Sequence, residues 1–300
     1  MILEQHEPNV HVIKLEGNKC RIAMLSDIHW DNPKCDWKLL KSHLDYCLEH
    51  SIPIHINGDF YCVMAGKYDF RSSKSGIRPM HNVDNYLDAL IDTSVEWFKP
   101  YAHLIALVSY GNHETAIQKR HETDLIERFA SKMNLSEGTN IQVGGYGGWL
   151  VVELNDKSVR CPFRIKYHHG LSKGASVVTK GAIDLTRSMG ITESMDVFTQ
   201  GHIHQSMSRN DVREKLVSLP KSGYRIAVQK IHHMITGTYK EEYFGTGGMG
   251  WHYSRGAEAR NLGGRIMTLS FKRVWNGKSS KQKNKRNIVK HVDSCLFPVL

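Results

Sequence analysis

The segment VSYGNHETAI, residues Val108–Ile117, changes character at its fourth residue. An apolar run of strand-forming residues, Leu104–Ser109, leads into Gly111, Asn112 and His113. Glycine adopts backbone angles that other residues avoid, and asparagine is rare in strands, so a turn accounts for both. A turn does not account for the histidine, and the same change follows several other apolar runs of this chain.

Six apolar runs predict β-strands, and helical patterns lie between several of them. Apolar residues recur at spacings of three and four in Trp37–Leu48, Val83–Phe98 and Leu125–Met133. Strands that alternate with helices predict an α/β fold with a largely parallel central sheet. The predicted strands are Arg21–Ser26, Ile52–Asn57, Leu104–Ser109, Trp149–Leu154, Phe163–Tyr167 and Asp196–Thr199.

The last third of the chain has a different pattern. Residues 212–271 contain short apolar stretches separated by glycines and show no helical period. This pattern predicts a second, mostly antiparallel sheet that packs against the first within the same domain. We therefore expect one domain over residues 1–271, with its second sheet completed by residues 212–271, and a basic tail over residues 272–300.

The predicted tail supplies most of the formal net charge of +10. Residues 271–292 contain no acid, and a chain with this excess of positive charge attracts anionic partners such as DNA or RNA. The alternative is a solvated, flexible tail without a partner. Its basic residues are Lys272, Arg273, Lys278, Lys281, Lys283, Lys285, Arg286 and Lys290.

The composition excludes some classes of protein. With 40% hydrophobic and 23% charged residues, the chain is that of a globular protein, and no apolar run approaches the roughly 20 residues that span a bilayer. The N-terminus carries acids and a proline early and is a poor export signal. The six cysteines form no CxxC pair, which favours reduced thiols over disulfides. We expect a cytoplasmic protein without a membrane partner.

Metal-binding residue types follow five of the six predicted strands. In an open α/β sheet, ligands bind at the carboxyl ends of the strands, so these side chains are expected at one edge. The segments that follow the strands are Asp27-Ile28-His29, Gly58-Asp59, Gly111-Asn112-His113-Glu114, His168-His169-Gly170 and Gly201-His202-Ile203-His204.

These residues suit a metal site and are too many for one ion. Carboxylates, imidazoles and a carboxamide bind borderline divalent metals such as manganese, iron, nickel or zinc. In Asp27-x-His29 and in His202-x-His204, the two members point to the same side of an extended chain. Asp59 has two carboxylate oxygens and could bridge ions about 3.5–4 Å apart.

Two adjacent divalent ions have a defined chemistry. They bind a phosphoryl group, generate a hydroxide nucleophile near neutral pH and offset charge on the phosphate oxygens. The leaving oxygen needs a proton, and His113, next to the ligand Asn112, is positioned to supply it. The strand ends at Ser109 because Asn112 is needed at the metal and His113 at the substrate.

Each motif alone is weak, because loops are rich in Asp and His. A lone DxH or GD carries little information, and even GHxH could be two surface histidines. All five motifs in this order, each after an apolar run, are hard to obtain by chance.

The series D-x-H, G-D, G-N-H-E, strand-end His and G-H-x-H resembles the calcineurin-like metallophosphoesterase superfamily from Asp27 to His204. The resemblance implies a four-layer αββα sandwich, in which helices flank two mixed sheets and a dinuclear metal site lies at the strand ends. It implies two divalent ions, with manganese the leading candidate and iron, zinc and nickel the alternatives. The family has a single metal-binding histidine where this chain offers His168 and His169, and the position next to Gly170 favours His169.

The resemblance also implies a role for each residue. Asp59 would bridge the two ions, His113 would donate the proton, and Glu114 would orient its loop. Ligands of the first metal would be Asp27, His29, Asp59 and His204, and those of the second would be Asp59, Asn112, His169 (or His168) and His202.

The substrate is less well defined. Tyr110 stands where protein phosphatases of the superfamily have an arginine, which argues against that group. The long connection 60–82 carries basic residues, of which Arg71 and Arg78, together with Glu114, are candidate substrate-binding residues. The aromatic residues Tyr61, Tyr68, Phe70, Trp251 and Tyr253 could stack bases, or they could simply pack.

Three functions follow from these observations. The leading hypothesis is a phosphodiesterase or nuclease that acts on nucleic acid or nucleotides. The second is a phosphomonoesterase for a nucleotide or another small molecule. The third is an inactive scaffold, but scaffolds usually lose metal ligands, and here each expected ligand is present.

Overall fold

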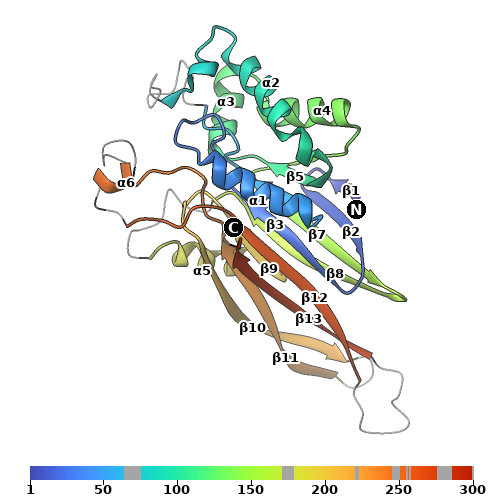
Figure 1. Cartoon of the computed structure of the whole chain (residues 1–300). Helices are drawn as coiled ribbons and strands as arrows, with labels where there is room; N and C mark the ends of the chain where they lie inside the picture. Colours follow the sequence, from blue (N-terminus) through green and yellow to red (C-terminus); the bar gives the residue numbers. More distant parts are fainter. Residues whose placement is uncertain are drawn as a thin grey trace.

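The computed structural model describes residues 1–63, 76–170, 179–219, 223–244, 251–254, 256, 258–275 and 286–298. These residues form two mixed β-sheets with helices beside them (Figure 1). The six-stranded sheet has the order β13 (Arg286–Leu296), β12 (Arg265–Trp275), β3 (Lys19–Leu25), β4 (Ile54–Asn57), β5 (Ile105–Ser109) and β6 (Gln142–Gly144). Strands β3 to β6 are parallel, and β12 pairs antiparallel with both β3 and β13.

The seven-stranded sheet mixes both kinds of pairing. Strands β2 and β7, β8 and β9, and β9 and β11 are parallel, whereas the remaining neighbours are antiparallel. Its order is β1 (Ile2–Glu7), β2 (Val10–Glu16), β7 (Gly147–Asp156), β8 (Val159–His168), β9 (Val197–Gln200), β11 (Gly223–Ile235) and β10 (Met207–Leu219).

Three helices pack their apolar faces against the six-stranded sheet: α1 (Trp37–Glu49), α2 (Tyr86–Phe98) and α4 (Leu125–Glu137). Asp36 and Asp124 cap α1 and α4 by accepting hydrogen bonds from backbone N–H groups in the first turn. The remaining helices are α3 (Asn112–His121), α5 (Ala182–Ile191), α6 (Trp251–Ser254) and the 3₁₀ helices η2 (Pro79–His81) and η3 (Lys99–Leu104). None of the helices in the described ranges is long and apolar enough to cross a membrane.

A second apolar core lies between the two sheets. Alternate residues of facing strands fill it, such as Ile22 and Met24 of β3 and Leu150, Val152 and Leu154 of β7. A smaller cluster joins Leu185 of α5 to the strands β9 and β11 of the seven-stranded sheet. The prediction of two mixed sheets flanked by helices is confirmed.

The six predicted strands and the three predicted helices are all present, with ends that differ by a few residues. The organisation of residues 212–271 differs from the prediction. Strands β10 and β11 extend the seven-stranded sheet, whereas β12 joins the six-stranded one. A local pattern cannot assign a strand to one of two sheets, because the pairing depends on distant residues. The central sheet is also less parallel than predicted, since β12 runs antiparallel to both β3 and β13.

The predicted boundary between the domain and a basic tail at residue 272 is wrong for the described residues. Strand β12 crosses it, and β13 returns beside β12 over its whole length. Two of the basic side chains form ion pairs, Arg273 with Asp156 at 2.9 Å and Lys290 with Asp196 at 2.7 Å. Residues 276–285, with four of the eight basic residues, lie outside the described part.

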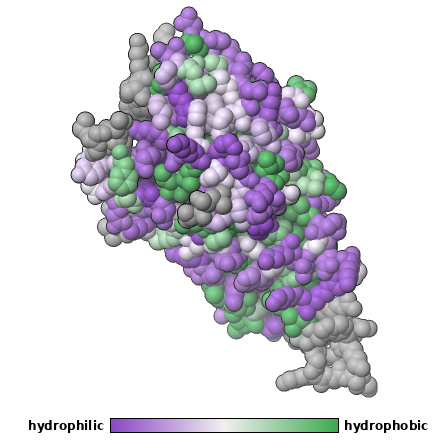
Figure 2. Space-filling view, viewed as in Figure 1, coloured by the Kyte–Doolittle hydropathy of each residue, from purple (hydrophilic) through white to green (hydrophobic). Residues whose placement is uncertain are grey.

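The long hairpins also carry apolar residues on their surface. Val212 and Leu216 of β10 and Ile226 and Val228 of β11 are exposed. Figure 2 shows apolar side chains among hydrophilic ones over the part of the molecule where the hairpins lie.

Candidate metal centre

Five strands from the two sheets end at the same place. The segments that follow β3, β4 and β5 of one sheet meet those that follow β8 and β9 of the other. Backbone hydrogen bonds connect them: His29 N–H donates to the carbonyl of Asp59, Asp27 N–H to that of Gly58, and Gly201 N–H to that of His169, each over 3.0 Å. The predicted convergence at the carboxyl ends of the strands is confirmed.

The backbone is strained at this place. Five non-glycine residues of the motifs have positive φ: Asp27 (50°), His29 (49°), Asp59 (48°), His202 (68°) and His204 (56°). This conformation costs on the order of 1–3 kcal/mol per residue and tends to cluster at functional sites. The surrounding fold holds these five residues in the strained conformation, with their side chains in the interior of the site.

One cluster contains Asp27, His29 and His204, whose ligating atoms lie within 4.8 Å of one another. Asp27 Oδ1 lies 3.2 Å from His204 Nε2, which lies 3.3 Å from His29 Nε2. The other oxygen of Asp27 accepts hydrogen bonds from the Ser26 hydroxyl and from the backbone N–H of His202. One carboxylate oxygen is therefore fixed by the protein, and the other faces the two imidazoles.

The other cluster contains Asp59, His169 and His202, again within 4.8 Å. His169 Nε2 lies 3.2 Å from both Asp59 Oδ2 and Asn112 Oδ1. His169 Nδ1 donates to the carbonyl of Asn57 over 3.0 Å, which directs Nε2 into the cluster. The rings of His169 and His202 lie 5.3 Å apart. The structure thus brings all seven predicted ligand positions together.

The two candidate histidines at the end of β8 have different surroundings. His169 is fully buried in the cluster, whereas His168 Nδ1 accepts a hydrogen bond from Gly170 N–H and its ring contacts Tyr146. Burial, with the charge of Lys166, lowers the pKa of His168 to about 4. Of the two, only His169 is positioned to bind an ion in the cluster.

His113 lies beside both clusters. Its Nδ1 donates to the carbonyl of Cys62, and its backbone N–H donates to Asp59 Oδ1 over 3.0 Å. Its Nε2 lies 3.9 Å from Asp59 Oδ2, and its ring lies 5.0 Å from that of His29. His113 thus contacts Asp59 and His29, one residue of each cluster, and its side chain is only partly buried.

Glu114 is buried and accepts three backbone hydrogen bonds, from Gly111, Asp59 and Tyr61. Burial and the charge of Asp59 raise its pKa to about 8. These contacts agree with the predicted role of orienting the loop. Both carboxylate oxygens accept backbone hydrogen bonds, and the substrate-binding role of Glu114 stays a prediction.

Arg78 is not at the site either. It is buried, stacks on Trp37 and donates two hydrogen bonds to the carbonyl of Asn32. It lines a separate cavity of about 540 Å³ with Pro33, Cys35, Trp37, Pro79 and Met80. The position of Arg78 in a long connection predicted a substrate-binding residue. Its guanidinium instead holds that connection against Trp37 and the carbonyl of Asn32. Arg71, Tyr68 and Phe70 lie outside the described residues.

Three charged residues at the first cluster were not predicted from the sequence. Glu242 Oε2 lies 3.4 Å from His204 Nδ1, and Lys240 Nζ contacts the other oxygen of Glu242 at 2.8 Å. Arg260 donates to the carbonyl of Ile203 over 2.7 Å. Their segments show no local signal, because "YKEEYF" has the composition of an exposed loop. A backbone hydrogen bond from Tyr239 to Asp27 holds this segment at the site.

The pKa values of the cluster residues depend on the charges of their neighbours. Burial alone would lower the pKa of His169 and His204, but Asp59 raises the former to about 10 and Asp27 the latter to about 9. Burial would raise the pKa of Asp59, but His169 and His113 hold it well below its ordinary value. Burial also lowers the pKa of His29 and His202. Protons thus balance the carboxylates where a cation could replace them.

The donor set fits divalent cations. Asp27 Oδ1 is a buried atom that forms no hydrogen bond among the residues the structure describes, and its near neighbour is His204 Nε2 at 3.2 Å. Buried carboxylates and imidazoles without other partners are expected where cations bind. The chemistry of these groups therefore agrees with a metal centre.

Comparisons with known proteins add little to this picture. No protein-family model matches the chain, and no curated protein sequence matches it. Among solved structures, the chain resembles the one described as "GAP50 the anchor in the inner membrane complex of Plasmodium". That likeness has 10% sequence identity and a TM-score of 0.38 over 85% of this chain and 82% of the other. A similarity this low supports no inference about family or activity.

Proposed function

We propose that the protein is a metal-dependent phosphoester hydrolase of the calcineurin-like type, with a dinuclear centre in a four-layer αββα sandwich. The observation that carries the proposal is the convergence of Asp27, His29 and His204 with Asp59, His169 and His202 in two adjoining clusters. Asn112 adds a carboxamide oxygen beside His169. Manganese is the leading candidate for both ions, with iron, zinc and nickel as alternatives.

When bound, two divalent ions would supply an activated water nucleophile and neutralise charge on the phosphate. The residues of the chain set the geometry. The carbonyl of Asn57 orients His169, Ser26 orients Asp27, and Glu114 holds the backbone of Asp59. Because these supporting groups are themselves buried, the ligands are held before any ion arrives.

His113 is proposed to donate the proton that the leaving oxygen needs. The carbonyl of Cys62 can only accept, so Nδ1 of His113 must carry a hydrogen and Nε2 is the nitrogen that exchanges a proton. The backbone hydrogen bond from His113 to Asp59 fixes its distance from the clusters. The residue can thus act as a general acid beside the metal ligands.

The preferred substrate is a phosphodiester of nucleic acid or of a nucleotide. The chain carries a formal net charge of +10, and Arg260 lies beside the first cluster, where it donates to the carbonyl of Ile203. Such charge attracts polyanions from a distance. No membrane partner is proposed.

Hydrolysis of a small phosphomonoester is the second candidate, and the position of the basic segment favours it. Arg265 of β12 pairs with Met24, close to Asp27, and Ser270 pairs with Lys19. Strand β12 therefore carries Lys272 and the following residues away from the clusters. The basic side chains from Lys272 onward would not contact a short substrate held at the metal centre, so they do not determine which phosphoester binds there.

Metal-stripped protein, reloaded with manganese, would be assayed on bis-p-nitrophenyl phosphate and on p-nitrophenyl phosphate. We expect faster turnover of the diester and loss of turnover with chelator. Preference for the monoester would support the second candidate. Absence of turnover of both compounds with manganese, iron, zinc and nickel would contradict the hydrolase and favour an inactive scaffold. A steep fall in DNA or RNA binding as salt rises would support a nucleic-acid substrate.

A further inference from the structure

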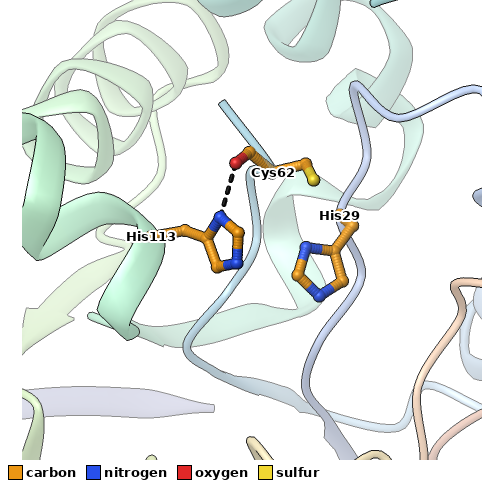
Figure 3. Close-up of side chains that lie close together, drawn as sticks. All are labelled: His29, Cys62 and His113. Atoms are coloured by element: carbon orange, nitrogen blue, oxygen red, sulfur yellow. Dashed lines mark hydrogen bonds between the residues drawn. The ribbon is translucent and has the colours of Figure 1, made fainter. Parts of the chain in front are cut away.

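Cys62 forms a third group of possible ligands with two histidines of the site. Its sulfur and ring nitrogens of His29 and His113 lie within 4.8 Å of one another. Figure 3 shows the thiol above the two imidazoles, with a ring nitrogen of His29 on the side of the sulfur. This group, the Cys62 triad, shares His29 with the first cluster and differs from both clusters in containing a sulfur.

The donors of the Cys62 triad select a different class of ion. One thiolate and two imidazoles are soft to borderline ligands, which favour zinc and cobalt over manganese or magnesium. Three protein ligands leave a fourth tetrahedral position for water. The thiol loses its proton to solvent when an ion binds, so the ion forms a sulfur bond without any redox partner.

The triad is held in place by neighbouring residues. The carboxylate of Asp31 accepts the backbone N–H groups of Cys62 and Val63, and Asn32 Nδ2 donates to the sulfur over 3.2 Å. The carbonyl of Cys62 orients His113. Burial raises the pKa of the Cys62 thiol to about 12, so an ion must displace the thiol proton in order to bind the sulfur.

His29 can bind an ion of the triad through Nδ1 and an ion of the first cluster through Nε2 at the same time only if its ring N–H proton is released to solvent, because a neutral imidazole offers one lone pair. Its Nε2 lies 3.3 Å from His204, while its buried Nδ1 has no hydrogen-bond partner in the described part of the chain. A buried polar atom in this state has a free-energy cost that a ligand would relieve. This is the independent observation that points to an ion.

We propose that the Cys62 triad is an inhibitory site for thiophilic divalent cations, with zinc as the physiological type. An ion held there occupies Nε2 of His113, which then cannot carry the proton for the leaving oxygen. Ion binding at the triad stands without the proposed hydrolase activity, whereas inhibition rests on it.

Cobalt reports sulfur ligation directly, because a thiolate bound to Co²⁺ produces a near-ultraviolet charge-transfer absorption that oxygen and nitrogen ligands do not. Metal-free protein would be titrated with Co²⁺ and compared with Cys62→Ser and with Cys161→Ser, a buried thiol of the core between the sheets. We expect the absorption in the parent and in Cys161→Ser, and its loss in Cys62→Ser. Visible Co²⁺ bands without it in the parent, or its persistence in Cys62→Ser, would overturn the triad.

Inhibition would be tested separately with manganese-loaded protein and added zinc. Each variant is normalised to its own activity without zinc. We expect about a tenfold weaker inhibition in Cys62→Ser than in the parent or in Cys161→Ser, since one of three ligands is lost. Equal inhibition of all three proteins would overturn the inhibitory role even if the cobalt spectrum confirmed the triad. Failure of the hydrolase would show as no turnover before zinc is added.

Discussion

Two histidines of the candidate metal centre and two histidines of the apolar core are largely buried, but their pKa values are shifted in opposite directions. Beside Asp59 and Asp27, the pKa of His169 is raised to about 10 and that of His204 to about 9. In the core, burial lowers the pKa of His55 to about 3 and that of His43 to about 4. His43 bonds to Tyr239 and stacks on Phe297, and His55 bonds to Ser109, so neither has a carboxylate partner.

The difference shows that burial alone does not decide the state of a histidine. Low polarity disfavours the charged ring in both regions, and carboxylate oxygens at 3.2 Å reverse this effect at His169 and His204. A near carboxylate is not always sufficient, because burial lowers the pKa of His233 to about 4 although Asp211 lies 3.3 Å away. The buried histidines thus divide into those with a raised and those with a lowered pKa. The following predictions test this division, beginning with the largest effect.

Asp59→Asn should abolish the metal centre while it keeps the shape of the side chain. The carboxylate charge that balances His169 and His113 is lost, and the activity on bis-p-nitrophenyl phosphate should fall by roughly a thousandfold or more. Metal content, measured by atomic emission after dialysis, should fall with it. An activity within tenfold of the parent would remove Asp59 from the centre. The control is Asp45→Asn, a half-buried carboxylate of α1 that bonds to Lys41 and Tyr101 rather than to a cluster residue.

His169→Ala and His168→Ala separate neighbouring residues of the same strand end. His169→Ala should lose one of the two ions and about a hundredfold of the activity, because His169 lies in the cluster. His168→Ala should keep both ions, since its ring bonds to Gly170 instead. Equal loss of metal from both variants would contradict the assignment.

Glu242→Gln tests a residue that supports the first cluster without belonging to it. Glu242 contacts Nδ1 of His204, and removal of such a partner typically weakens metal affinity by about 10–100-fold. Titration calorimetry with Mn²⁺ would measure the affinity. Glu241→Gln is the matched control, because Glu241 caps Tyr243 and Phe244 rather than a ligand. An equal loss in both variants would assign the effect to the loop alone.

His43→Phe tests the core population and has the smallest effect. The folded pKa of His43, about 4, is below its ordinary value, so its contribution to stability is present above about pH 6.5. It is lost as pH falls toward 4, because the unfolded chain takes up the proton first. The slope of unfolding free energy against pH in this window should fall by about 1.4 kcal/mol per pH unit in His43→Phe and in His43→Asn.

Urea unfolding of the metal-free protein at several pH values would give that slope. A packing effect alone would lower the free energy of unfolding equally at every pH. Unchanged slopes in both variants would contradict the neutral state of His43 in the folded protein.

Most of the metal centre could be predicted from the sequence. Asp27, His29 and Asp59 follow strands directly, and parallel strands bring such ends together whatever the rest of the sequence does. His202 and His204 are predictable in the same way. The choice of His169 over His168 was favoured by its neighbour Gly170, and the structure decides it through the hydrogen bond with Asn57.

Charged residues outside the motifs were the source of the errors. Arg78 is of a residue type that binds phosphates, yet it is buried by contacts that a local pattern does not record. The basic residues in 272–290 predicted a tail, because their charge masks the alternation of apolar and polar residues that is typical of a strand. The pairing of β13 with β12 stabilises a strand there instead. Strand pairing depends on a partner elsewhere in the chain, not on composition.

The sequence by itself determined the order of strands and helices and the residue types at the five strand ends, because apolar periodicity and turn chemistry are local. Only the tertiary structure decided which sheet each late strand joins, and which distant residues complete the site. Glu242 lies by His204 and Cys62 by His29 and His113, although nothing in their own segments distinguishes them. Such neighbours are set by the free energy of packing two sheets together, a quantity that belongs to the whole chain.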